Sequence, residues 1–170
     1  MIKGVITDVV IVLLDAGWLE LRSLYQGKKY AGVPKLTVSA KEALAHAGPN
    51  LDLKTVAGAP GGLVTVEPFS HPRFVVTDTE FAGRLLRDFL RGLYGRKRLL
   101  PFVDMFIYPP AARRKDLTFV EAEALREAAR KAGAKGFVVT IDRIFTAADM
   151  KEMKRVRFDE VLENHLKGET

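Results

Sequence analysis

One segment carries the clearest helix and strand signals of the chain: residues 102–141 read FVDMFIYPPAARRKDLTFVEAEALREAARKAGAKGFVVTI. Both of its ends are runs of β-branched and aromatic residues, which predict two buried strands. Between them, Thr118 and Glu121 form a capping box that predicts a helix over Phe119–Ala132, and Gly133 ends it. A strand, a helix and a second strand predict a parallel pair joined by a right-handed crossover.

The rest of the chain adds strands and helices on the amino-terminal side and one helical stretch after the segment. The predicted strands are Lys3–Leu14, Trp18–Tyr25, Tyr30–Val38, Leu63–Val66, Phe102–Tyr108 and Gly136–Ile141, and the other predicted helices are Ala40–Ala47, Glu80–Leu93 and a stretch between Ala147 and Leu166. Pro34 places the third strand at an edge or a bulge. Three strands followed by alternating helices and strands predict an α/β fold, a mixed sheet with flanking helices.

Composition sets limits on the function. The 170 residues suit a single domain, 1–170, with a core over about 1–148 and a helical cap at about 150–166. No cysteine is present, which excludes disulfides, thiolate catalysis and Cys-ligated zinc, and three histidines give no metal-binding pair. Lysine and arginine (27) exceed aspartate and glutamate (21), so the net charge of +6 favours anionic partners without naming one.

Motifs for phosphate binding and for membrane insertion are missing from the sequence. Neither Gly-x-Gly-x-x-Gly nor Gly-x-x-x-x-Gly-Lys-Ser/Thr occurs. The most apolar run, Val9–Leu14, is far shorter than the roughly 20 residues that a membrane span needs. We therefore expect a cytoplasmic protein, with peripheral contact at the inner face of the membrane as an open alternative.

Residues Leu117–Ala134 resemble a helix of the rod-shape-determining bacterial actins, the MreB family, which reads Ile-Thr-x-Val-Glu-x-x-Ala-x-x-Glu-Ala-Ala-x-x-Ala-Gly-Ala at this place. Phe106–Pro109 is similar to the strand before that helix, and Gly136–Ala148 to the strand and helix start after it. The resemblance covers about residues 10–148. It implies domain I of the actin-like ATPase fold, with a ribonuclease-H-like sheet.

The same resemblance implies a degenerate nucleotide site. The family's first phosphate loop falls at Asp15, Gly17 and Trp18, where the bulky Trp18 replaces a small residue. The family's Glu-Glu pair corresponds to Asp142 and Arg143, and an arginine cannot act as a base at neutral pH. The second domain, with the other phosphate loop, has no counterpart in the sequence. We therefore expect no catalytic residues, no metal and no cofactor.

A further implication concerns attachment and partners. A basic, apolar-tipped loop resembles the family's membrane loop and consists of Arg96, Lys97, Arg98, Leu99 and Leu100. The expected partner is a protein, either a second copy of the chain or a filament-forming actin homologue. The protein would then be a non-catalytic scaffold or assembly module in cell-shape or cytoskeletal organisation.

Two other functions stay open. One is a half-site ATPase completed by dimerisation, with ATP and magnesium, in which Asp15, Asp104 and Asp142 at strand ends hold a divalent ion. The other is nucleic-acid binding through the arginines of the helix Glu80–Leu93 and the basic loop. Few aromatic residues are interleaved with that patch, so nucleic acid is the less favoured partner.

Overall fold

The computed structural model describes residues 7–15, 17–46, 62–71, 73–95 and 102–139. Its strands are β1 (Thr7–Asp15), β2 (Trp18–Ser23), β3 (Lys29–Gly32), β4 (Leu36–Ser39), β5 (Leu63–Val66), β6 (Phe102–Tyr108) and β7 (Gly136–Val139). Its helices are α1 (Ala40–Ala45), α2 (Thr79–Tyr94), the 3₁₀ helix η3 (Ala111–Asp116) and α3 (Phe119–Ala132).

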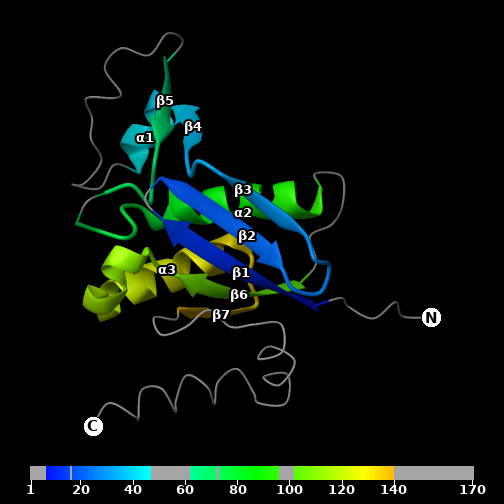
Figure 1. Cartoon of the computed structure of the whole chain (residues 1–170). Helices are drawn as coiled ribbons and strands as arrows, with labels where there is room; N and C mark the ends of the chain where they lie inside the picture. Colours follow the sequence, from blue (N-terminus) through cyan, green and yellow to red (C-terminus); the bar gives the residue numbers. More distant parts are fainter. Residues whose placement is uncertain (1–6, 16, 47–61, 72, 96–101, 140–170) are drawn as a thin grey trace.

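Five strands form the main sheet in the order β3-β2-β1-β6-β7 (Figure 1). The first three strands make an antiparallel meander, and β1 then pairs in parallel with β6, which pairs in parallel with β7. Parallel neighbours need a crossover connection, and here α2 precedes β6 and α3 precedes β7. This mixed sheet confirms the predicted ribonuclease-H-like arrangement.

Helices α2 and α3 pack side by side against one face of the sheet, where the main core lies (Figure 1). The side chains of Val10 and Val12 on β1 and of Leu85 and Leu90 on α2 are buried there. The opposite sheet face holds a second, smaller cluster of buried side chains. Its members are Val9, Ile11, Phe106 and Tyr108. Alternation along β1 and β6 therefore sends apolar residues to both faces, as expected for strands in the middle of a sheet.

A small unit follows β3 and corrects one sequence prediction. Residues 30–38, predicted as one strand interrupted by Pro34, form two strands in different sheets. β4 pairs with β5, and α1 packs against both at the top of Figure 1. The proline interrupts the ladder as expected, but the chain uses the break to leave the main sheet rather than to form a bulge.

Local sequence signals set the helix ends. Asp78 caps α2 through a hydrogen bond from the amide of Phe81, 2.8 Å long. Thr118 and Glu121 form the predicted capping box of α3, and Gly133 ends that helix at φ +100°. The 3₁₀ helix η3 was not predicted. No helix within the described ranges has the length and apolar character needed to cross a bilayer.

Candidate functional site

The turn between β1 and β2 brings the predicted phosphate-loop equivalents Asp15, Gly17 and Trp18 together. Asp15 ends β1 and pairs with Trp18, which begins β2, so the chain reverses within two residues. Gly17 has φ +72°, a conformation that glycine adopts without steric penalty. The Trp18 side chain is 47% exposed at the edge of the sheet where β1 ends. This turn is thus a tight hairpin with a large exposed indole at its base.

The opposite end of β1 holds a buried polar network around Asp8, whose exposure is 0%. Oδ2 of Asp8 accepts hydrogen bonds from the hydroxyl of Ser23 at 2.5 Å and from that of Tyr94 at 2.7 Å. Oδ1 accepts from the amides of Val9 at 2.8 Å and Tyr25 at 3.3 Å. Burial, and then the Asp8 carboxylate, raise the pKa of the Tyr94 hydroxyl, which therefore stays protonated and donates. The network joins the start of β1, the β2–β3 turn and the end of α2.

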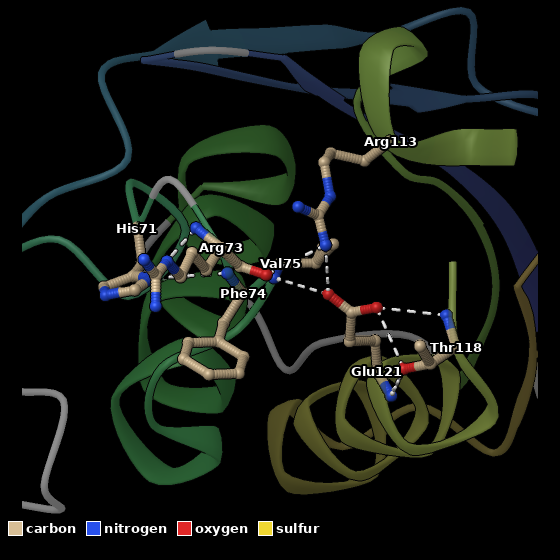
Figure 2. A network of polar contacts seen from close by, with 7 residues as sticks. All are labelled: His71, Arg73, Phe74, Val75, Arg113, Thr118 and Glu121. Carbon is tan, nitrogen blue, oxygen red and sulfur yellow. Dashed lines mark hydrogen bonds and ion pairs between the residues drawn. The ribbon is translucent and has the colours of Figure 1, made fainter. Parts of the chain in front are cut away.

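A second polar network surrounds Glu121 at the start of α3 (Figure 2). Its Oε2 accepts from the amide and hydroxyl of Thr118 at 3.0 and 2.9 Å. Its Oε1 accepts from Nη2 of Arg113 at 2.7 Å and from the amide of Val75 at 3.4 Å. The same Arg113 nitrogen donates to the carbonyl of Arg73 at 2.9 Å. One carboxylate therefore ties together η3, the loop before α2 and the first turn of α3.

The pKa of Glu121 gives a testable pH dependence. Burial raises this pKa, but hydrogen bonds from Thr118 and Val75 and the charge of Arg113 outweigh burial and hold it below 4.5. A carboxyl whose pKa is lower in the folded than in the unfolded protein stabilises the fold at every pH above its unfolded-state pKa. This stabilisation is lost as the pH falls through the folded-state pKa.

We expect Glu121→Gln to lower the free energy of unfolding at pH 7 by about 1.5–3 kcal/mol, the range for hydrogen bonds to charged groups. The difference from the parent protein should shrink below pH 4.5, as measured by urea unfolding across pH 3–7. A difference that stays constant over that range would contradict this role for the carboxylate. Glu123→Gln, at an exposed position on the same helix, is the matched control.

The arginines proposed for nucleic-acid binding are engaged within the protein. On α2, Arg84 pairs with Glu42, and Arg91 Nη1 lies 3.3 Å from Asp88 Oδ1. Arg87 donates to the carbonyl of Lys131 on α3. The two ion pairs offset the charges of Arg84 and Arg91, whereas the Arg87 guanidinium, bound to a neutral carbonyl, keeps its charge. The Arg96–Arg98 run lies outside the described residues.

Two of the three aspartates proposed to hold a divalent ion lie far apart in the structure. Asp104 on β6 stands opposite Val9 on β1, whereas Asp15 lies six residues further along β1. At about 3.3 Å per residue, the two carboxylates are separated by roughly 20 Å along the strands. The structure therefore does not bring Asp15 and Asp104 to one site. In the described part of the chain, no three His, Asp or Glu side chains gather as metal ligands do.

Two apolar side chains at the start of α3 are conspicuously exposed, Phe119 at 71% and Val120 at 75%. They precede Glu121, whose hydrogen bonds fix the first turn of the helix, so both are held on a rigid support. The helical pattern alone did not single them out, because an apolar residue in the first turn of an amphipathic helix is expected to face the core. One feature of the sequence could have shown that Phe119 and Val120 are exposed: the buried side of α3 is already supplied by other apolar residues at helical spacing. These are Leu125, Ala128, Ala129 and Ala132.

The remaining predicted site residues lie outside the described residues. They are Lys97, Leu99 and Leu100 of the membrane-like loop, with its two arginines, and Asp142 and Arg143 of the glutamate-pair equivalent. The predicted helical cap at 150–166 also lies there.

This mixed α/β fold, a five-stranded sheet flanked by helices, matches the actin-like ATPase domain of solved MreB structures. Two solved structures with this likeness are of MreB5 from Spiroplasma citri. The ADP-bound crystal structure has a TM-score of 0.52 and 18% identity, covering 79% of this chain and 38% of that protein. The AMPPNP-bound structure has a TM-score of 0.52 and 19% identity, covering 78% and 38%.

This likeness establishes a partial MreB-like fold. The chain spans well under half the length of the MreB5 structures that it matches. No protein-family model and no curated protein match the sequence. The ADP and the AMPPNP are ligands of the MreB5 structures.

Proposed function

We propose that this protein is a non-catalytic actin-like assembly module, which binds a second actin-like subunit through Phe119 and Val120 at the start of α3. The observation that carries the proposal is the exposure of this adjacent apolar pair, 71% and 75%, on a helix end that Glu121 fixes. Burying a phenylalanine or a valine in an interface contributes roughly 1.5–3 kcal/mol each. Charged residues are usually depleted at such interface centres, and aromatic residues enriched.

The β1–β2 turn supports the non-catalytic half of the proposal. Trp18 stands where the resembled family has a small residue close to the nucleotide phosphates, and its indole is bulky and half exposed. A phosphate site needs backbone N–H groups that approach the anion closely, which a large neighbouring side chain obstructs. Loss of nucleotide handling leaves assembly as the function that the fold still serves.

The charge pattern of α3 favours a second copy of this chain as the partner. Its exposed surface alternates acid and base, with Arg126 beside Glu123 and Arg130 beside Glu127. Two such helices related by a two-fold axis place the acids of one opposite the bases of the other, because an isologous interface must be self-complementary. The two-fold axis would then cross α3 between Arg126 and Glu127, and each apolar pair would lie at one end of the contact.

Light scattering coupled to size exclusion tests this surface. We expect the parent protein to show a mass that rises with concentration, and Phe119→Ser/Val120→Ser to remain a monomer. The matched control is Leu44→Ser/Leu63→Ser, two exposed apolar residues in the small unit away from α3 (Figure 1). Equal association by the parent and the α3 variant would show that this pair is not the interface.

A further inference from the structure

A groove of about 790 Å³ opens between β3, the segment that follows it and α2. Among the side chains that line it are Tyr30, Val33 and Lys35 on one wall and Phe89 and Arg91 on the other. It lies at the β3 edge of the sheet, whereas α3 packs against β7 near the opposite edge (Figure 1). The groove is therefore separate from the apolar pair that begins α3.

The backbone beside the groove is the edge of a sheet. β3 is the last strand in the order β3-β2-β1-β6-β7, and within the described residues it pairs with β2 alone. An edge strand presents unpaired N–H and C=O groups that an additional strand can join. Extended peptides bind proteins in this way, with the backbone supplying affinity and pockets for alternate side chains supplying specificity.

The groove has an apolar floor that suits an inserted side chain. Gly32, at the end of β3, has no side chain, and a Cβ built there would meet the ring of Phe89 at 3.7 Å. Tyr30 packs edge-on against the same ring, with centroids 5.3 Å apart, and Val33 is 49% exposed at the rim. The missing side chain at Gly32 thus leaves room for a methyl-sized group beside the Phe89 ring, which is itself only 7% exposed.

The charges around the groove indicate what kind of segment fits. Arg91 is engaged by Asp88, at 3.3 Å, but Lys35 makes no ion pair with any described residue. Lys29 on the same edge is engaged as well, with Nζ 3.0 Å from Oε2 of Glu20. Pairing of two copies edge to edge would add Lys35 of both chains to the same interface, and like charges at an interface are destabilising. A segment that carries carboxylates would instead place negative charge beside the positive charge of Lys35.

We propose that this groove binds an extended, acidic segment of a protein partner, which adds to β3 as a further strand and inserts an apolar side chain over Gly32. This groove is a second interface, independent of assembly through α3. Through it the protein would bind a partner that is not another copy of itself. Backbone pairing sets the register, and Lys35 selects for negative charge.

The test uses a fluorescein-labelled peptide of alternating aspartate and valine, titrated into the full chain while backbone amide shifts are recorded. We expect shifts confined to Lys29–Leu36 and the facing part of α2. Gly32→Ala should weaken binding at least tenfold, because its Cβ occupies the floor at 3.7 Å from the Phe89 ring, an ordinary contact distance, and Gly32 lies outside the left-handed region. Unchanged thermal unfolding of this variant shows that the fold is retained.

Charge variants and a second peptide complete the test. Lys35→Glu should weaken binding, whereas Lys41→Glu on the exposed side of α1 should not. A peptide of alternating lysine and valine should bind at least tenfold more weakly than the aspartate form. Equal binding of both peptides, wild-type affinity in Gly32→Ala, or no binding at millimolar peptide would overturn the proposal. Phe119→Ser/Val120→Ser should bind the peptide normally, so failure of one interface is distinguishable from failure of the other.

Discussion

Replacing Asp8 by alanine is expected to lower the free energy of unfolding by about 2–6 kcal/mol, because it leaves the buried hydroxyls of Ser23 and Tyr94 without their acceptor at about 1–3 kcal/mol each. The amides of Val9 and Tyr25 lose a bond as well. In a chain of this size each kcal/mol corresponds to about 2–4 °C in Tm. Urea unfolding and thermal scans measure both quantities.

The control for Asp8→Ala is Asp15→Ala, which removes the same side chain from the exposed end of the same strand. Exposed charged groups contribute about 0–1 kcal/mol, so this variant should unfold close to the parent. If Asp8→Ala does not fold, Ser23→Ala removes the bond to Asp8 and the one that its hydroxyl accepts from the amide of Gln26 at 3.0 Å, and it should lose about 1–3 kcal/mol. Equal stability of the two aspartate variants would contradict the role assigned to the buried network.

Gly83→Ala is the second substitution with a large expected effect. A Cβ at Gly83 would lie 2.5 Å from Cβ of Lys131 and 3.0 Å from the carbonyl oxygen of Ala128, so α2 and α3 must separate to admit it. Alanine gains about 1 kcal/mol over glycine in helix propensity. Overpacking against rigid backbone typically costs about 1–3 kcal/mol, so we expect a net loss of stability in urea unfolding.

Gly92→Ala on the same helix provides the contrast. Its Cβ would collide with the ring of Tyr30, but that ring is 41% exposed at the groove and can swing away. We therefore expect Gly92→Ala to be clearly less destabilising than Gly83→Ala. The reverse order would mean that the α2–α3 contact tolerates expansion and that the Tyr30 ring does not.

The helices and strands whose bounds were predicted correctly are those whose sequence patterns lie within the element itself. Phe102–Tyr108 and Phe119–Ala132 have the predicted bounds, because a continuous apolar run and a capping box are local features. Pro34 shows the limit of local signals. Pro34 indicates a break in residues 30–38. Whether the chain then stays in the main sheet depends on the pairing of β4 with β5, and β5 begins nearly thirty residues after Pro34.

The candidate sites also differ in whether they depend on local or on distant residues. The turn at Asp15–Trp18 was predictable from its turn residues, and it lies at the end of β1 as expected. The Asp8 network was not, since Tyr94 reaches Asp8 from 86 positions away and no sequence spacing reports such a contact. The separation of Asp15 from Asp104 likewise depends on the register of β1 with β6, which strand-end positions in the sequence do not give.

We propose that this actin-like domain assembles without using nucleotide. Sedimentation velocity over a range of protein concentrations, with and without millimolar ATP and magnesium, tests it directly. A bound nucleotide at a hundredfold excess over its Kd would add about 2.7 kcal/mol of stability and couple to assembly by mass action. We predict concentration-dependent assembly that is identical in the two conditions and absent in Phe119→Ser/Val120→Ser. A protein that stays monomeric without nucleotide, or that assembles only when ATP and magnesium are present, would contradict the account.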